Sequence, residues 1–554
     1  MNRLICLALL ALACCAPSFA DTTWVADSTI TYATWSADHS PYMIQTNVRV
    51  FGGLQIGPGV TAYFTGPYSL TVSSHACLMA LGTASDSIRF TTDTLSNPDR
   101  WYGVSIDRGR ADSCRFDYCI IEFSKSDSSV EHSKGLYAYD TDLRISNCTF
   151  RYCGAHTFRG GGLGVEQGWL TMESCHVVNN SGTWSVTLAG GGLVENCLIE
   201  GNDGGGVRID TDDSLTVSHC VIRNNQAENG GGLRLMSNSV WQLNITGCDI
   251  SGNRAHDGGG ICGGAANADI RECTFSNNHA DSSGGAIWHG ELAFRYCLFD
   301  GNTAAIGGAC ADVQGAGFNC TFVNNQAPQG GAAIYTMIGF GATLYNTIVA
   351  FNRQSPAISF GAIPIHWVSN CLLFGNEDGD FTGYIPPFLG EINRTNPNGD
   401  SCDYHSNLFQ NPLFADTTSG NYHLTAQSPC IDAGDSRLSL DPDSTIADIG
   451  AYYFPHPDAV EPSFILQPSA FILSVYPNPF NPSTRITYDL PVPANVRLRI
   501  FDVLGRETAV LVDDHMNAGR YSIEWNAQSF PSGTYFVVMQ AADKRFIQRM
   551  LLLK

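Results

Sequence analysis

A short pattern of apolar and polar positions recurs along the middle of the chain. It reads cysteine, any residue, an apolar residue, two further residues and asparagine, as in Cys220-Val-Ile-Arg-Asn-Asn225. Residues i and i+2 share one face of a strand, so the cysteine and the apolar residue are predicted to point together into a core. The cysteines of this column, predicted to form a structural ladder, are Cys148, Cys175, Cys197, Cys220, Cys248, Cys273, Cys297, Cys320 and Cys371.

The spacing of the pattern identifies a repeat. From Cys119 to Cys371 successive copies begin 22 to 29 residues apart, with Thr347 in place of one cysteine. Three residues before most copies lies a second apolar column, which includes Val194 and Val217. Short strands separated by bends, with no helical period, exclude leucine-rich and helical solenoids. The sequence therefore predicts an all-β fold, a parallel β-helix of about 14 coils.

Glycine and asparagine mark the bends between these strands. Runs such as Gly230-Gly-Gly232 and Gly258-Gly-Gly260 follow the asparagine of each copy by a few residues. Glycine supplies the positive φ that a sharp turn requires. Asparagine at a bend tolerates the left-handed conformation, and coils stacked about 4.8 Å apart allow its amide to form a ladder along the axis.

These residues resemble the parallel β-helix repeats of pectate lyases and of many large exported bacterial proteins. That resemblance implies a right-handed β-helix. Phe275-Ser-Asn-Asn278 and Gly284-Gly-Ala-Ile287 are also similar to the repeats of chlamydial polymorphic outer-membrane adhesins. The C-terminal barrel of that second family is not evident in this sequence.

The chain divides into six predicted segments. Residues 1–20 read as a signal peptide: Arg3 precedes an apolar run, and Ser18-Phe-Ala20 offers a cleavage site before Asp21. Cys14 and Cys15 leave a lipoprotein alternative open. The other segments are an N-terminal cap with the first coils (21–118), regular repeats (119–400), a closing segment of the β-helix (401–454), a proline-rich linker (455–469) and a small β-sandwich (470–554).

The last segment carries the most specific motifs in the chain. Tyr476-Pro-Asn-Pro-Phe480 precedes several short alternating strands, which predict a small immunoglobulin-like sandwich. The sequence of this segment closely resembles the C-terminal sorting domain of the type IX secretion system. The resemblance implies handling by that machinery, export across the outer membrane and a location on the cell surface or outside the cell. The alternative is a tail that only folds.

Charge narrows the range of partners. The chain has a net charge of −22, and residues 21–469 hold 20 Lys and Arg against 45 Asp and Glu. An acidic body disfavours nucleic acid and anionic membranes as partners. After signal removal no stretch is long and apolar enough to predict a transmembrane helix.

The cysteines allow two interpretations. Neighbouring ladder side chains are parallel and about one strand spacing apart, farther than the ~3.8 Å that disulfide Cβ atoms prefer. Buried cysteine is also a good small core residue, so a reduced structural stack is favoured over a redox or metal role. Cys402 and Cys430 lie outside the register and are the predicted disulfide.

The candidate site follows the glycine turns. Arg208 and Arg234 occupy one predicted column on adjacent coils, Trp288 shares it, and Asp210 and His289 lie close by. An outward stripe of arginine and tryptophan can stack on sugar rings and pair with uronate groups, which predicts carbohydrate contact. A turn rich in aspartate is the structural alternative, and no catalytic residue is assigned.

Two functions of different classes remain open. One is a non-catalytic adhesin or glycan-binding surface protein, which the lack of a recognisable acid and base set favours. The other is a displayed polysaccharide lyase or glycoside hydrolase, the reactions that such β-helices often host. No cofactor is predicted, apart from Ca²⁺ as a weaker candidate at carboxylates whose spacing fits no EF-hand. These are Asp432, Asp435, Asp441, Asp443 and Asp448.

Overall fold

The computed structural model describes most of the chain after the predicted signal peptide. The described residues are 22–110, 114–125, 135–154, 161–236, 243–264, 268–337, 341–362, 366–456, 472–476, 480–490, 493–503, 505–516, 519–541 and 544–552. The signal peptide and most of the predicted linker lie outside them. The chain forms two compact units, the second holding residues 440–445 and 455–554.

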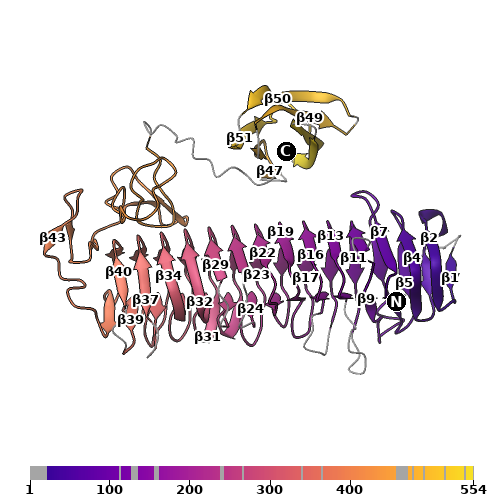
Figure 1. The fold of residues 1–554 in the computed structure, drawn as a ribbon, viewed down its shortest axis with the longest axis horizontal. Helices are drawn as coiled ribbons and strands as arrows, with labels where there is room; N and C mark the ends of the chain where they lie inside the picture. Colours follow the sequence, from indigo (N-terminus) through magenta and orange to yellow (C-terminus); the bar gives the residue numbers. More distant parts are fainter. Residues whose placement is uncertain are drawn as a thin grey trace, which may run out of the picture. The chain divides into compact units, whose positions relative to one another are not determined.

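The first unit is a parallel β-helix in which successive coils stack as a ladder (Figure 1). Its first sheet, sheet A, has 15 strands, one from each coil, in agreement with the predicted repeat. Sheet A comprises β1 (Thr23–Val25), β3 (Tyr42–Ile44), β5 (Thr61–Phe64), β8 (Ile88–Thr91), β11 (Cys119–Glu122), β14 (Thr149–Arg151), β17 (His176–Val178), β20 (Leu198–Glu200), β23 (Val221–Arg223), β26 (Asp249–Ser251), β30 (Thr274–Ser276), β33 (Leu298–Asp300), β35 (Thr321–Val323), β38 (Ile348–Ala350) and β41 (Leu372–Phe374).

The second sheet, sheet B, has 25 strands in two halves that each coil crosses in turn. The leading half comprises β6 (Ser69–Val72), β9 (Gly103–Asp107), β12 (Leu136–Tyr139), β15 (Leu163–Glu166), β18 (Val186–Ala189), β21 (Val207–Ile209), β24 (Leu233–Leu235), β28 (Ile261–Cys262), β36 (Ile334–Tyr335), β39 (Ile358–Phe360) and β42 (Phe381–Gly383). The trailing half comprises β7 (Cys77–Leu81), β10 (Cys114–Asp117), β13 (Leu143–Ser146), β16 (Leu170–Glu173), β19 (Gly192–Glu195), β22 (Leu215–Ser218), β25 (Leu243–Thr246), β29 (Ala268–Arg271), β37 (Ala342–Tyr345) and β40 (Trp367–Ser369). Four longer strands run through both halves: β2 (Thr29–Trp35), β4 (Val48–Ile56), β32 (Ile287–Arg295) and β34 (Cys310–Phe318).

The remaining elements of this unit are short. They are the 3-10 helix η1 (Ala37–His39) and the pairs β27 (Arg254–Asp257) with β31 (His279–Ser283), β43 (Arg394–Thr395) with β44 (Ser401–Cys402), and β45 (Phe414–Asp416) with β46 (Asn421–Leu424). At the N-terminal end β1 pairs in register with β3, and β2 with β4. Within the described residues, the N-terminal segment therefore extends both sheets.

The inward side chains form one continuous core. The residue two after each ladder cysteine is buried, and its partners on neighbouring coils lie directly above and below it. The rings of Phe275 and Phe299 stack with centroids 4.8 Å apart, and those of Phe299 and Phe322 with centroids 4.4 Å apart. Period-2 alternation therefore builds the core that the sequence predicted.

Buried asparagines form a hydrogen-bonded ladder along the axis. The Asn278 side-chain amide donates to Asn302 Oδ1 at 3.0 Å and to the Ile250 carbonyl at 2.8 Å. Its own Oδ1 accepts from the backbone N–H and the side chain of Asn253, both at 3.1 Å. The same donated bonds repeat on consecutive coils from Asn180 to Asn352, whose side-chain amide donates to Asn376 Oδ1 at 3.0 Å. The left-handed bends belong to other asparagines, such as Asn196 with φ 53°, so ladder and bend are made by different positions.

The ladder cysteines are buried free thiols, as are nearly all of the 17 described cysteines. The backbone N–H of Cys148 lies 3.4 Å from Cys175 Sγ on the next coil, and that of Cys248 lies 3.4 Å from Cys273 Sγ. Burial raises the pKa of the Cys371 thiol to about 12. The stack therefore fills the core with neutral thiols.

The predicted disulfide between Cys402 and Cys430 is not present. Both residues are free thiols, and both are buried in an apolar cluster with Leu408, Tyr422 and Leu424. Each side chain serves there as a small core residue. Cysteines outside the repeat register therefore fill a core in the same way as those within it.

The closing segment folds back along the outer face of sheet A. The Asn319 amide donates to the Asp448 carbonyl at 2.9 Å, and the Ala451 N–H donates to Thr321 Oγ1 at 3.0 Å. Apolar residues of the segment cover outward side chains of β33, β35, β38 and β41. In these coils the outer face of sheet B, and not that of sheet A, is therefore open to a ligand.

The second unit is a small antiparallel β-sandwich. One sheet contains β47 (Ile472–Tyr476), β48 (Ser483–Leu490) and β51 (Gly519–Asn526). The other contains β49 (Ala494–Asp502), β50 (Glu507–Met516), β52 (Gly533–Ala541) and β53 (Lys544–Leu552). Both sheets contribute to one core, in which Trp525 and Tyr488 from the first meet Val537 and Met550 from the second.

Candidate ligand-binding site

The column predicted from the glycine turns lies on the leading half of sheet B. Arg208 pairs in register with Arg234, Arg234 with Cys262, and Cys262 with Trp288. The two arginines are therefore on adjacent coils, and Trp288 lies two coils beyond Arg234. Arg208, Arg234 and Trp288 are all half-buried.

Both arginines of this column have partners within the protein. Arg208 Nη2 donates to Asp210 Oδ2 at 2.8 Å. Arg234 Nε lies 3.0 Å from the sulfur of Met236, and its Nη1 lies 3.4 Å from that of Cys262. A guanidinium already engaged by a carboxylate is a weak receptor for a further anion. The geometry therefore gives little support to uronate pairing at Arg208, whereas the two neutral sulfur atoms beside Arg234 do not compensate its charge.

His289 marks the bend between the two halves of sheet B. Its φ of 58° and the φ of 54° at Asp312 are left-handed, and single residues of this kind turn β32 and β34 from one half into the other. The Trp288 and His289 rings are 5.8 Å apart. Asp312 is buried and accepts the Met337 N–H at 2.6 Å, and burial raises its pKa despite that bond and the nearby His289.

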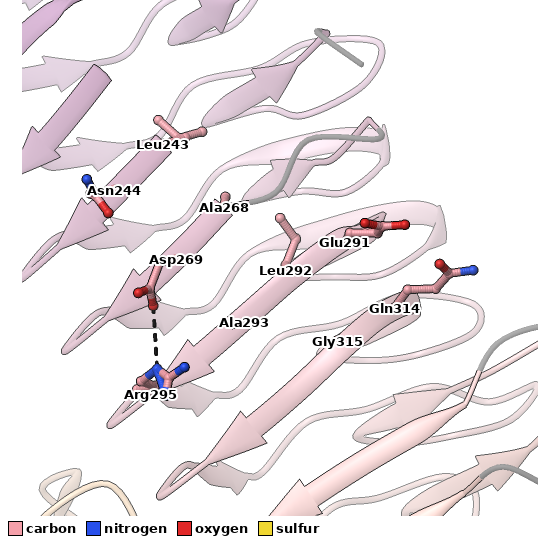
Figure 2. A pocket seen from close by; sticks show the side chains of 10 residues that line it. All are labelled: Leu243, Asn244, Ala268, Asp269, Glu291, Leu292, Ala293, Arg295, Gln314 and Gly315. Carbon is pink, nitrogen blue, oxygen red and sulfur yellow. Dashed lines mark ion pairs between the residues drawn. The ribbon is translucent and has the colours of Figure 1, made fainter. Parts of the chain in front are cut away.

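A groove begins beside this bend, on the outer face of sheet B (Figure 2). In other coils several residues separate the two halves, for example those between the end of β21 at Ile209 and the start of β22 at Leu215. In β32 and β34 the halves are continuous, so these coils take a shorter path. The groove has a volume of about 500 Å³ and is lined by Leu243, Asn244, Ala268, Asp269, Glu291, Leu292, Ala293, Arg295, Gln314 and Gly315.

Polar side chains stand on two sides of the groove, and the small apolar side chain of Ala293 lies outward between Glu291 and Arg295 on β32. Figure 2 shows Glu291 and Gln314 at one side and Asp269 with Arg295 at the other, with Leu292 between them. Arg295 Nε lies 3.6 Å from Asp269 Oδ1, and Arg271 Nε donates to Asp269 Oδ2 at 2.9 Å. One carboxylate thus holds both guanidiniums. Apolar surface with a few fixed polar groups is typical of small-molecule and saccharide sites.

An aromatic stripe continues from Arg295 along the axis. The Arg295 guanidinium lies 5.0 Å from the centre of the Phe318 ring, and the Phe318 and Tyr345 rings stack 5.3 Å apart at 7°. These three residues occupy one register column on β32, β34 and β37. Trp367, on the next strand β40, faces outward and is 50% exposed.

The sequence prediction missed this groove and stripe, although a signal for them exists. Arg295 and Phe318 stand two positions before a ladder cysteine, and Tyr345 stands two before Thr347. In earlier copies the same position is polar or acidic, as at Glu195 and Ser218. The change to arginine and aromatic residues is confined to the late coils, where the groove lies.

A pair of carboxylates lies elsewhere on the trailing half. Glu173 of β16 and Glu195 of β19 are register neighbours on adjacent coils. Partial burial and the charges of Glu195 and Asp117 raise the pKa of Glu173. The interaction with His219, whose Nδ1 lies 3.7 Å from Glu195 Oε1, lowers the pKa of Glu195. Two carboxyl groups with pKa values moved apart are a starting point for acid and base chemistry.

The aspartates considered for Ca²⁺ are engaged in local bonds. Asp448 accepts the Asp432 N–H at 2.8 Å and the Phe454 N–H at 2.6 Å, and Asp435 accepts two bonds from the Arg437 guanidinium. Among the described residues no group of three or more His, Cys, Asp or Glu side chains could hold a metal ion. Calcium binding therefore stays an untested prediction, without a preformed site in the described parts.

Each of the two units contains a region that matches a known protein family. Residues 102–275 match the right handed beta helix region, and residues 474–553 match the secretion system C-terminal sorting domain. Residues 272–290 and 319–337 match the Chlamydia polymorphic membrane protein repeat. No curated protein matches the chain. In the described residues no helix is long and apolar enough to cross a membrane.

The fold and these matches together define a class of protein. The chain is a right-handed parallel β-helix repeat protein with a C-terminal sorting domain of the type IX secretion system. The sorting domain indicates handling by that machinery and secretion to the cell surface or the extracellular space. Of the two stretches similar to the chlamydial repeat, residues 272–290 lie between the groove residues Asp269 and Glu291 and include Trp288 and His289, and residues 319–337 follow Gly315.

Proposed function

We propose that this secreted protein is a non-catalytic glycan-binding protein or adhesin of the cell surface, and that its ligand occupies the groove on sheet B. The observation that carries the proposal is the groove at β25, β29, β32 and β34 with its aromatic continuation through Phe318 and Tyr345. Sugar rings present apolar faces and hydroxyl edges. Aromatic rings can stack on the apolar faces, and fixed carboxylate, amide and guanidinium groups can form hydrogen bonds with the hydroxyl groups.

A steric variant tests the proposal. Ala293 lines the groove and points outward, so Ala293→Ile should obstruct it, while isoleucine remains compatible with a strand. The matched control is Ser251→Ile, outward on β26 of sheet A. Retention of the full chain on immobilised polysaccharides should fall at least tenfold for the first variant and stay unchanged for the second. Equal retention of both variants would place the ligand elsewhere or refute glycan binding.

Glycoside hydrolysis is the second candidate, carried by Glu173 and Glu195. Retaining glycosidases place two carboxyl groups about 5 Å apart, which is close to the spacing of adjacent coils. The supporting observation is that their surroundings move the two pKa values in opposite directions. Release of reducing ends that is abolished in Glu173→Gln would establish this activity. If no reducing ends are released from any neutral or acidic polysaccharide, glycoside hydrolysis is refuted.

A further inference from the structure

The charges around the groove limit which glycan it can take. Arg295 and Arg271 both contact Asp269, and Arg295 also lies over the Phe318 ring. These two guanidiniums share one carboxylate, and among the groove-lining residues the carboxylates of Asp269 and Glu291 outnumber the one cation, Arg295. An incoming carboxylate or sulfate would therefore enter a groove lining with a net negative charge.

The opposite wall adds repulsion. Glu291 is exposed at the rim of the groove and makes no ion pair among the described residues. An anionic ligand would therefore lie near this negative charge, and Arg295, the one cation among the groove-lining residues, already lies 3.6 Å from Asp269. Hydroxyl and amide groups meet no such obstacle, since they can donate to Glu291 and bond with Gln314 and Asn244.

The aromatic stripe sets the direction and the minimum length of the ligand. Arg295, Phe318, Tyr345 and Trp367 lie on β32, β34, β37 and β40, which follow one another along the axis (Figure 1). Three coil steps of about 4.8 Å separate the first from the last, roughly 14 Å along the axis. Trp367 lies beside Thr343, two residues from the column of Tyr345. A single sugar cannot contact both the groove and Trp367, whereas a short extended chain can.

We infer that the groove and stripe bind an uncharged polysaccharide, extended along the helix axis from Glu291 and Gln314 over Phe318 and Tyr345 to Trp367. The inference rests on the proposed glycan-binding function and adds its ligand class. It differs from the uronate pairing predicted from the sequence for the column of Arg208 and Arg234, because the groove lining holds two carboxylates, Asp269 and Glu291, against one arginine, Arg295.

The experiment compares retention of the full chain on neutral glucan, xylan and chitin with retention on polygalacturonate and alginate, at low salt without Ca²⁺. The wild type is expected to be retained at least tenfold more strongly on one neutral polymer than on either polyuronate. Glu291→Lys should raise retention on the polyuronates about tenfold, since it replaces the free anion with a cation. Trp367→Ala should weaken binding of the neutral polymer roughly fivefold, whereas Trp24→Ala, on the exposed face of β1, should not.

The possible outcomes distinguish a failure of the uncharged ligand class from a failure of glycan binding itself. Wild-type preference for a polyuronate, lost in Ala293→Ile, would overturn the uncharged class and leave glycan binding in the groove standing. Equal effects of Trp367→Ala and Trp24→Ala would overturn the path along the stripe. Absence of retention on every polymer, with an unchanged β-rich circular dichroism spectrum, would overturn both the inference and the proposed function.

Discussion

The asparagine ladder allows a quantitative prediction about what holds the coils together. The Asn278 side chain is fully buried and makes four hydrogen bonds, two donated and two accepted. Asn278→Ala removes all four and leaves the Asn253 N–H and the Ile250 carbonyl without these partners. At about 1 kcal/mol for each bond, the free energy of unfolding should fall by about 4 kcal/mol.

Urea unfolding of the full chain, followed by far-ultraviolet circular dichroism, measures this loss. The matched control is Asn393→Ala, at an exposed position just before β43, with an expected change below about 0.5 kcal/mol. Asn302→Ala should cost as much as Asn278→Ala. The double variant should cost about 1 kcal/mol less than the sum, because the two side chains share one bond. A loss below about 1 kcal/mol for Asn278→Ala would refute a stabilising ladder.

Three further predictions concern the core, the thiols and the acid response. Phe299→Ala, within the stacked rings of the core, should lower the free energy of unfolding by about 3–5 kcal/mol in the same urea assay. A loss under about 1 kcal/mol would contradict continuous stacking. Burial raises the pKa of the Cys371 thiol to about 12, so this thiol should not react with iodoacetamide at pH 8 in the native protein. Mass spectrometry should find the label at Cys77 and not at Cys371. Label at Cys371 in folded protein would show that the cysteine stack is accessible to solvent. The lowered pKa of Glu195 stabilises the folded protein at pH values above the unfolded pKa of this group, and this stability is lost as pH falls through the folded pKa. His219→Ala should therefore lose less stability than the wild type between pH 5 and pH 3. The difference should be less than about 1 kcal/mol, because the site is half-exposed. Parallel pH profiles for the two proteins would contradict that pairing.

Most of the β-helix could be predicted from the sequence because the repeat fixes its own register. A cysteine and an apolar residue two positions apart specify an inward face, and every copy stacks on the next with the same alternation. The column of Arg208, Arg234 and Trp288 followed from this register, and the structure pairs these positions as expected.

What the repeat does not encode was harder to predict. The closing segment packs sideways on sheet A through contacts such as Asn319 with Asp448, which are remote in sequence. The groove depends on how two coils turn without an intervening loop, a property of backbone path rather than of any motif. The pairing of Cys402 with Cys430 was wrong, since both thiols are core residues of the cluster that this packing creates.

The most direct test of ligand binding in the groove is hydroxyl-radical footprinting of the full chain with and without a polysaccharide that retains it. Aromatic side chains on the proposed path should be protected, so oxidation of Phe318, Tyr345 and Trp367 is expected to fall at least threefold, while Trp24 on sheet A is unchanged. Protection confined to Trp288, or to residues of the closing segment, would contradict the placement of the ligand in this groove.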